Sequence, residues 1–217
     1  MRPVLAWAAG AVLCLAAPAA QAQNPCAQYV KFPAAGRWAE YRAVFNKKDP
    51  SAFRYAVVGV ERREGTEYTW FEWKMSGASP DQSFVYQMLL PQSPLQMGQI
   101  QEVVMKQGSR PAMKISGMMM SMIRGQMEKS SLFKDLCKDV TLVGSESVTV
   151  PAGTFKALHY RSEKNRTDSW VSPDLPFAMV KSVGENHEIR LTGQGDGAES
   201  SITETPQEMP GPGPGNR

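Results

Sequence analysis

The run 148–181 constrains the fold of this chain most, because short β-type segments alternate in it with tight turn signals. Pro151-Ala152-Gly153 separates two such segments, and Lys164-Asn165 and the Pro-containing stretch 172–176 separate the next ones. This spacing is typical of an antiparallel meander. The run contains no nucleophile motif, metal-ligand set or phosphate loop, so it predicts a fold and leaves the chemistry open.

Alternating apolar and polar residues extend this β character over much of the remaining chain. In 37–45 and in 66–75 the apolar and aromatic residues recur at every second position, which is the period of a half-buried strand. For 99–106 a strand is expected, with a short helix as the alternative. The expected strands are 37–45, 53–61, 66–75, 84–90, 99–106, 141–150, 154–162, 167–171, 177–183 and 187–193.

The hydrophobic period changes in the middle of the chain, where apolar residues fall at i, i+3, i+4, i+7 and i+8. Those residues are Ile115, Met118, Met119, Met122 and Ile123. The spacing predicts an amphipathic helix of about three turns, and a second short helix is expected at 131–138. Together these patterns predict a mainly β fold, a curled antiparallel sheet (an open half-barrel) with one or two helices packed across its concave side.

The N-terminus has the pattern of an export signal. Arg2 precedes an apolar run from Val4 to Ala17, and Ala20-Gln21-Ala22 fits a cleavage site after Ala22. The run is shorter than the ~20 residues that a membrane span needs. We therefore expect a periplasmic or secreted protein without a transmembrane segment. Cleavage would leave 217 − 22 = 195 residues, which we divide into one domain at 23–203 and a disordered tail at 204–217.

Charge and cysteine content narrow the function classes further. Without Arg2 the 24 basic residues become 23 against 21 acidic ones, interspersed along the chain, and this balance does not point to a nucleic-acid partner or an anionic membrane surface. Cys14 would leave with the signal, so Cys26 and Cys137 remain in an oxidising compartment. We predict that these two form a disulfide, and two separate buried thiols are the alternative.

The segments VTVPAGTFKALHY and DSWVSPDLPFAMVKS carry a resemblance to a known group of proteins. Over residues 140–192 the chain resembles the LolA/LolB-like superfamily of periplasmic half-barrels, in particular its uncharacterised branches. The resemblance implies an apolar cavity between sheet and helices that carries acyl chains, lipoproteins or glycolipids. It identifies no individual binding residue in this sequence.

The methionines suggest where such a ligand would bind. Six of them lie between Met113 and Met127, and flexible thioethers adapt to apolar ligands of varied shape. The alternative is a helix packed on a sheet with a filled core. The residues proposed to face a ligand are Phe71, Trp73, Met75, Ile115, Met118, Met119, Met122 and Ile123.

Other chemistries are weaker in this sequence. Soft thioethers select Cu(I), and Met119 and Met122 with His159 and His187 are candidate ligands, although the methionines also fit a buried helix stripe. No serine lies in a nucleophile-elbow pattern, and His159 has the setting of a packed strand residue. We therefore expect no catalysis, no cofactor and no resident metal. The sequence favours a monomeric envelope protein that binds an apolar or acyl ligand, such as a lipid. A structural module that binds an envelope protein partner is the alternative.

Overall fold

The structure, a computed structural model, describes residues 26–46, 48–77, 79–129 and 136–209. The strands are β1 (Trp38–Phe45), β2 (Ser51–Arg63), β3 (Thr66–Ser76), β4 (Phe84–Pro91), β5 (Glu102–Gln107), β6 (Met113–Ile115), β7 (Thr141–Val150), β8 (Gly153–Ser162), β9 (Thr167–Val171), β10 (Met179–Gly184), β11 (His187–Gly195) and β12 (Gln207–Glu208). The helices are α1 (Gly117–Lys129) and the short 3-10 turns η1 (Ala27–Tyr29), η2 (Pro80–Gln82) and η3 (Pro94–Gln99). The predicted leader (1–22), the core of the predicted second helix (131–135) and the end of the tail (210–217) lie outside the described residues.

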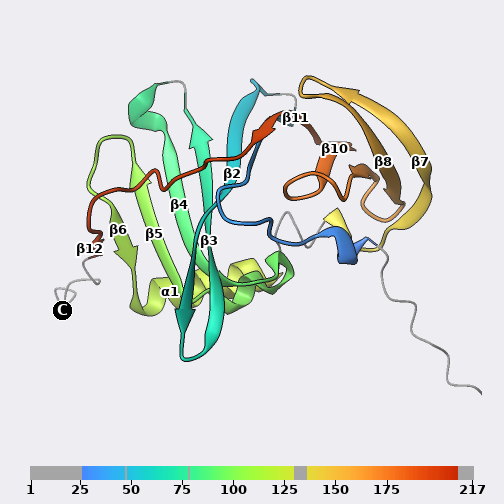
Figure 1. The fold of residues 1–217 in the computed structure, drawn as a ribbon. Coiled ribbons are helices and arrows are strands. Elements are labelled where there is room, and N and C mark those ends of the chain that lie inside the picture. Colours follow the sequence, from blue (N-terminus) through green and yellow to red (C-terminus); the bar gives the residue numbers. More distant parts are fainter. Residues whose placement is uncertain (1–25, 47, 78, 130–135, 210–217) are drawn as a thin grey trace, which may run out of the picture.

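The twelve strands of the described residues form one open sheet, in the order β12-β6-β5-β4-β3-β2-β1-β11-β10-β9-β8-β7. Every pair is antiparallel except β12 with β6. Register shifts, which mark β-bulges or similar irregularities, interrupt the pairing of β1, β2, β7 and β10. The extra residue of a bulge bends its strand and increases the local twist. The sheet is therefore curled, and α1 lies across its inner face (Figure 1). This confirms the predicted fold class.

The inner face of β1, β2 and β3 carries a filled aromatic core. Tyr41 stacks on Phe53 with ring centroids 5.2 Å apart, and Tyr55 and Phe71 follow with centroids 5.2 Å apart. Phe177, from the turn before β10, closes the cluster at 5.7 Å from Phe71. Burying rings of this size is a major source of stability, and edge-to-face geometry adds to it. The same face was predicted to be a ligand wall, and here it is occupied by the protein's own side chains.

The orientation of α1 differs from the sequence-based prediction. Met120 is buried, and Ile123 and Met127 pack against the core, three and seven residues further along the helix. Met118 and Met122, which were predicted to face the sheet, are exposed. The prediction was wrong because methionines lie on several sides of this helix, so the hydrophobic spacing alone does not select the buried side.

The C-terminal segment crosses the outer face of the sheet (Figure 1). It is fastened at Glu72, a buried carboxylate that accepts hydrogen bonds from the Ser201 amide (2.8 Å), the Ser201 hydroxyl (2.7 Å) and the Gln87 side chain (2.9 Å). Beyond it, β12 adds to the sheet edge beside β6. Residues 204–209 are therefore part of the folded domain, and the tail predicted at 204–217 begins too early. The composition of this segment does not indicate a strand, and its order comes from backbone hydrogen bonds with β6.

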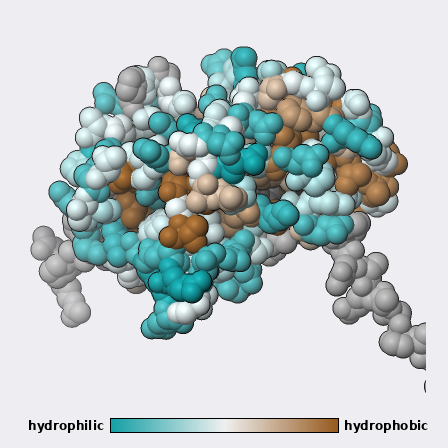
Figure 2. Space-filling view, viewed as in Figure 1, coloured by the Kyte–Doolittle hydropathy of each residue, from teal (hydrophilic) through white to brown (hydrophobic). Residues whose placement is uncertain are grey.

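Strand β7 forms the opposite edge of the sheet. Its side chains are mostly exposed, and Leu142 and Val143 are 46% and 55% exposed. Figure 2 shows apolar side chains gathered on the surface over this curled end of the sheet. The edge is therefore more apolar than the charged or proline-containing edges that discourage strand pairing with another chain.

Candidate functional site: a pocket on the inner face of strands β8 to β11

A cavity of about 370 Å³ lies on the inner face of the C-terminal half of the sheet. Its floor is formed by neighbouring strands from β8 to β11, and the segment Leu136–Val140 covers it. One part of the lining is apolar and consists of Phe45, Leu136, Val140 and Ile189. Another part is polar and consists of Ser162, Asn165, Thr167, Ser169, Ser182 and His187. The cavity therefore suits a molecule with both an apolar and a polar part.

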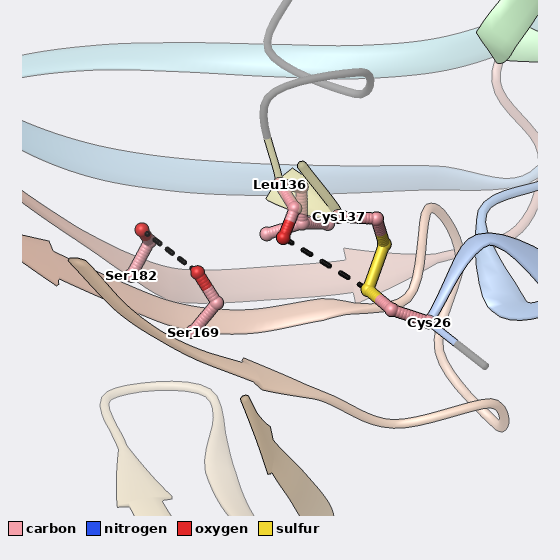
Figure 3. The surroundings of a disulfide bond; sticks show 5 residues. All are labelled: Cys26, Leu136, Cys137, Ser169 and Ser182. Carbon is pink, nitrogen blue, oxygen red and sulfur yellow. Dashed lines mark hydrogen bonds between the residues drawn. A yellow bond between two sulfur atoms is a disulfide. The ribbon is translucent and has the colours of Figure 1, made fainter. Parts of the chain in front are cut away.

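A chain of hydrogen bonds crosses the polar part of the floor. Ser169 on β9 lies 3.4 Å from Ser182 on β10, measured between the hydroxyl oxygens. The Ser182 hydroxyl lies 3.0 Å from Nε2 of His187 on β11. Figure 3 shows the two serines on adjacent strands beside the Leu136–Cys137 segment. Hydroxyl and imidazole groups that already share hydrogen bonds are oriented in advance for a polar ligand group.

The hairpin between β10 and β11 places His187 in the pocket. A Cβ atom on Gly184 would lie 2.5 Å from Cε1 of His187, so only glycine leaves room for the ring at this position. Burial lowers the pKa of His187, and the imidazole is therefore mainly neutral at neutral pH. A neutral ring offers one donor and one acceptor, which suits an uncharged or anionic polar group.

The predicted disulfide fixes the roof of the pocket. Cys26 and Cys137 are bonded across a sequence separation of 111, and both are buried. Cys137 lies between two roof residues, Leu136 and Lys138, so the bond ties the roof to the N-terminal segment (Figure 3). Lys138, one of the lining residues, is exposed and carries a positive charge. It adds a positive charge to the pocket lining.

The eight residues predicted to face a ligand lie elsewhere than in this pocket. Phe71 is 1% exposed and lies 5.4 Å from the ring of Phe32, and Trp73 lies 6.0 Å from that of Tyr86. Met75 and Ile123 pack against the same core, and Ile115 is buried within it. Met118, Met119 and Met122 are exposed on α1. None of the eight lines the pocket described above, so a ligand in that pocket would be bound by other residues.

A second polar cluster surrounds His159 on the opposite side of the sheet. Its Nε2 lies 2.6 Å from Asp168, its Nδ1 lies 3.4 Å from Glu146, and its ring stacks on Trp170 at 4.5 Å. Burial tends to raise the pKa of Asp168, but hydrogen bonds from Arg161 and His159 outweigh this and lower it. These contacts confirm the interpretation of His159 as a packed, hydrogen-bonded strand residue.

The described residues contain no group of three or more histidine, cysteine or acidic side chains arranged for a metal ion. No helix in the described part of the chain is long and apolar enough to cross a membrane. Both histidines are engaged in the sheet, His159 with Asp168 and His187 with Ser182.

The pocket residues were missed because serine and threonine are common in strands. The available signal was their position: Thr167 and Ser169 share one face of β9 with the buried Val171, whereas Asp168 and Trp170 lie on the other face. Small hydroxyl residues on an otherwise apolar inner face leave space beneath a covering segment. That signal becomes readable only when the inner face and the roof are known.

Comparison with known proteins supplies no family for this chain. No protein-family model matches the sequence, and no curated protein matches it. Among solved structures, a predicted exported protein with a YmcC-like fold from Bacteroides fragilis is 10% identical, with a TM-score of 0.38 over 77% of this chain and 99% of that one. A predicted lipoprotein from Parabacteroides distasonis is 14% identical, with a TM-score of 0.36 over 76% of this chain and 97% of that one. These values are too low to carry a function across, and membership of the LolA/LolB-like superfamily stays a prediction.

Proposed function

We propose that this protein is an exported, non-catalytic binding protein for a single-chain amphiphile, a molecule with an acyl-type tail and a polar head. The observation that supports this most directly is the cavity beneath Leu136–Val140, which has an apolar part and a hydroxyl-rich polar part. Its volume of about 370 Å³ lies within the usual range for small-ligand sites. The tail would contact Phe45 and Ile189, while the head would reach Ser182 and His187.

Export is supported by two independent features. The leader pattern ending at Ala22 precedes the described domain. The buried bond between Cys26 and Cys137 belongs to the kind of covalent link that forms and persists in oxidising compartments.

Binding would be driven mainly by transfer of hydrocarbon out of water. Each methylene that the pocket buries contributes about 0.8 kcal/mol. The head group would lose its hydrogen bonds to water on entering the pocket. The hydrogen-bonded chain of Ser169, Ser182 and His187 would replace these bonds, so that the head is not left buried without a partner. Lys138 lines the same pocket, and its positive charge favours an anionic head, such as a carboxylate, over a cationic one.

Several features favour binding over catalysis at this site. Ser182 is only 4% exposed, and its hydroxyl lies between Ser169 and His187. In the part of the chain that the structure describes, no carboxylate is hydrogen-bonded to His187 to orient it as a base. A serine–histidine contact alone lacks the third group and the oxyanion donors that acyl transfer requires.

A displacement experiment tests the proposal. A dansyl-labelled fatty acid is titrated into the protein purified from the periplasm of an expression host, and lauric acid, lauryl alcohol and laurylamine compete for it. The probe should bind one-to-one, and lauric acid should displace it best. Replacing Thr167 with tryptophan fills part of the cavity and should weaken binding roughly tenfold, the equivalent of about two lost methylenes.

Thr154→Trp is the matched control, because Thr154 is an exposed strand threonine outside the pocket lining. Equal weakening by both variants, or no binding of the probe by the wild type, would refute the proposal. Native mass spectrometry of the same preparation adds a second readout, since a bound amphiphile should be lost in Thr167→Trp and kept in Thr154→Trp.

The alternative function is a protein-binding envelope module. The observation that favours it is the exposed, apolar edge strand β7 with Leu142 and Val143. An open edge of this kind can accept an extended segment of a partner by strand addition. This alternative would hold if the protein bound no amphiphile and if the substitution Val143→Lys released an envelope protein that the wild type binds.

A further inference from the structure

Three of the five methionines of α1 point away from the core. Met118, Met119 and Met122 are 74%, 46% and 69% exposed, whereas Met120 on the other side is 8% exposed. The helix buries its apolar side through Met120, Ile123 and Met127, so the three exposed residues are not needed to attach it to the sheet. Their presence at the surface calls for a different explanation.

Helical geometry brings the three side chains together. With about 100° between successive residues, Met122 lies about 40° from Met118 and about 60° from Met119. Residues three and four apart are neighbours on a helix surface, with Cβ atoms about 5–6 Å apart. Met122 is therefore adjacent to both of the other two, and the flexible side chains can direct three sulfur atoms to one point.

The helix is a fixed platform for such a cluster. Its far side is buried in the core, and η3 packs against the helix. The contact is close, because a Cβ atom added to Gly98 of η3 would lie 2.9 Å from Cβ of Glu128. Arg124 donates a hydrogen bond from Nε to the carbonyl of Ile100 at 2.7 Å, so this cation is held by the neighbouring loop. The segment from Gly117 to Ile123 carries no charged side chain.

We propose that Met118, Met119 and Met122 form a surface site for Cu(I). Thioether sulfur is a soft, uncharged ligand that selects Cu(I) over the hard divalent ions. The cysteines Cys26 and Cys137 are joined to each other, so their sulfurs are not available as thiolates. Methionine remains a ligand under conditions that convert thiols to disulfides. The main objection from the sequence, that these methionines form the buried stripe of the helix, does not apply to residues with this exposure.

The chemistry of the ligands gives this site a distinctive pH dependence. Histidine and cysteine must lose a proton before they bind a metal, so their affinity rises with pH. Methionine has no proton to lose. Binding at Met118, Met119 and Met122 should therefore vary little with pH between about 5 and 8, where a histidine site loses most of its affinity on acidification.

Anaerobic Cu(I) titration against a chromophoric Cu(I) chelator tests the proposal. The protein should bind one Cu(I), and replacing the three residues together with leucine should abolish competition with the chelator. Each single Met→Leu change should weaken binding at least ~10-fold, because loss of a direct ligand exceeds the effect of losing an outer-shell partner. The controls are Met75→Leu and Met105→Leu, which alter partly buried methionines of the sheet and should leave Cu(I) binding unchanged.

Silver(I), which is stable in air, supplies a structural readout. On addition of Ag(I) to methyl-labelled protein, the methionine methyl resonances of residues 118, 119 and 122 should shift, and those of residues 75 and 105 should not. Leucine at exposed positions is not expected to disturb folding, and circular dichroism checks this. The proposal is overturned if the triple variant competes for Cu(I) as well as the wild type, if the wild type does not compete at all, or if affinity falls steeply on acidification.

Discussion

The disulfide should be one of the largest single contributions to stability in this protein. Cys26 and Cys137 close a loop across 111 positions. For a loop of this length the chain-entropy relation gives about 16 cal/mol/K, which corresponds to about 4–5 kcal/mol at 25 °C. We therefore expect the double variant Cys26→Ala/Cys137→Ala to lose up to this amount. Alanine is chosen because both positions are buried and serine would place two hydroxyls there.

Urea unfolding, followed by circular dichroism and tryptophan fluorescence, measures the loss. With a denaturant slope of about 2–3 kcal/mol/M, the midpoint should fall by about 2 M. Wild-type protein that has been reduced in urea and kept reduced is the matched control, and its unfolding curve should coincide with that of the variant. The reasoning is refuted if the variant loses less than about 1 kcal/mol with an unchanged slope. A large gap between the variant and the reduced wild type would instead assign the loss to the alanines.

Three further predictions test the rest of the structure. Met120→Ala should cost about 2–4 kcal/mol and Met118→Ala less than about 0.5 kcal/mol in urea unfolding, because only Met120 is buried; equal losses would mean that α1 is turned differently. Glu72→Ala should destabilise by about 2–3 kcal/mol, since it leaves the Gln87 amide without its carboxylate partner and frees the Ser201 anchor; hydrogen exchange should then accelerate in residues 198–209, and unchanged protection there would contradict the anchoring role. Burial lowers the pKa of His187 below its unfolded value of 6.5, so the unfolded chain binds the proton first on acidification. The contribution of His187 is therefore fully present above about pH 7 and is lost as the pH falls through 6.5 towards the folded pKa, and His187→Gln should flatten the stability profile between about pH 7 and 5.

The strands could be predicted because their signal is local. In β1 the alternation of Ala39, Tyr41 and Ala43 with polar residues reports which side is buried, and the structure places these three on the inner face. Turn residues such as Pro151-Ala152-Gly153 mark where β7 ends and β8 begins. Patterns of this kind need no knowledge of distant parts of the chain.

The rotation of α1 and the course of the C-terminus are not local in this sense. Met118 and Met120 have the same hydropathy, and only contacts with the sheet determine which of them is buried. The segment at 204–209 lacks an apolar period, and its order comes from partners distant in the sequence, including the ion pair of Glu204 with Lys106 at 2.6 Å. The pocket depends in the same way on a roof that a disulfide holds in place.

The two halves of the inner face differ in side-chain volume, and this difference explains why the cavity lies where it does. On β2 and β3 the inward positions carry rings such as Tyr55 and Phe71, which fill the space under the curled sheet. On β9 and β10 the corresponding positions carry Ser169 and Ser182, whose side chains extend much less far from the backbone. Interiors are normally packed to the density of organic crystals, so a gap over short hydroxyl residues in a sheet that elsewhere supplies aromatic rings is a specific feature. A fold selected only for stability would gain by filling it, and this supports the proposal that a ligand binds above these serines and not against the aromatic core.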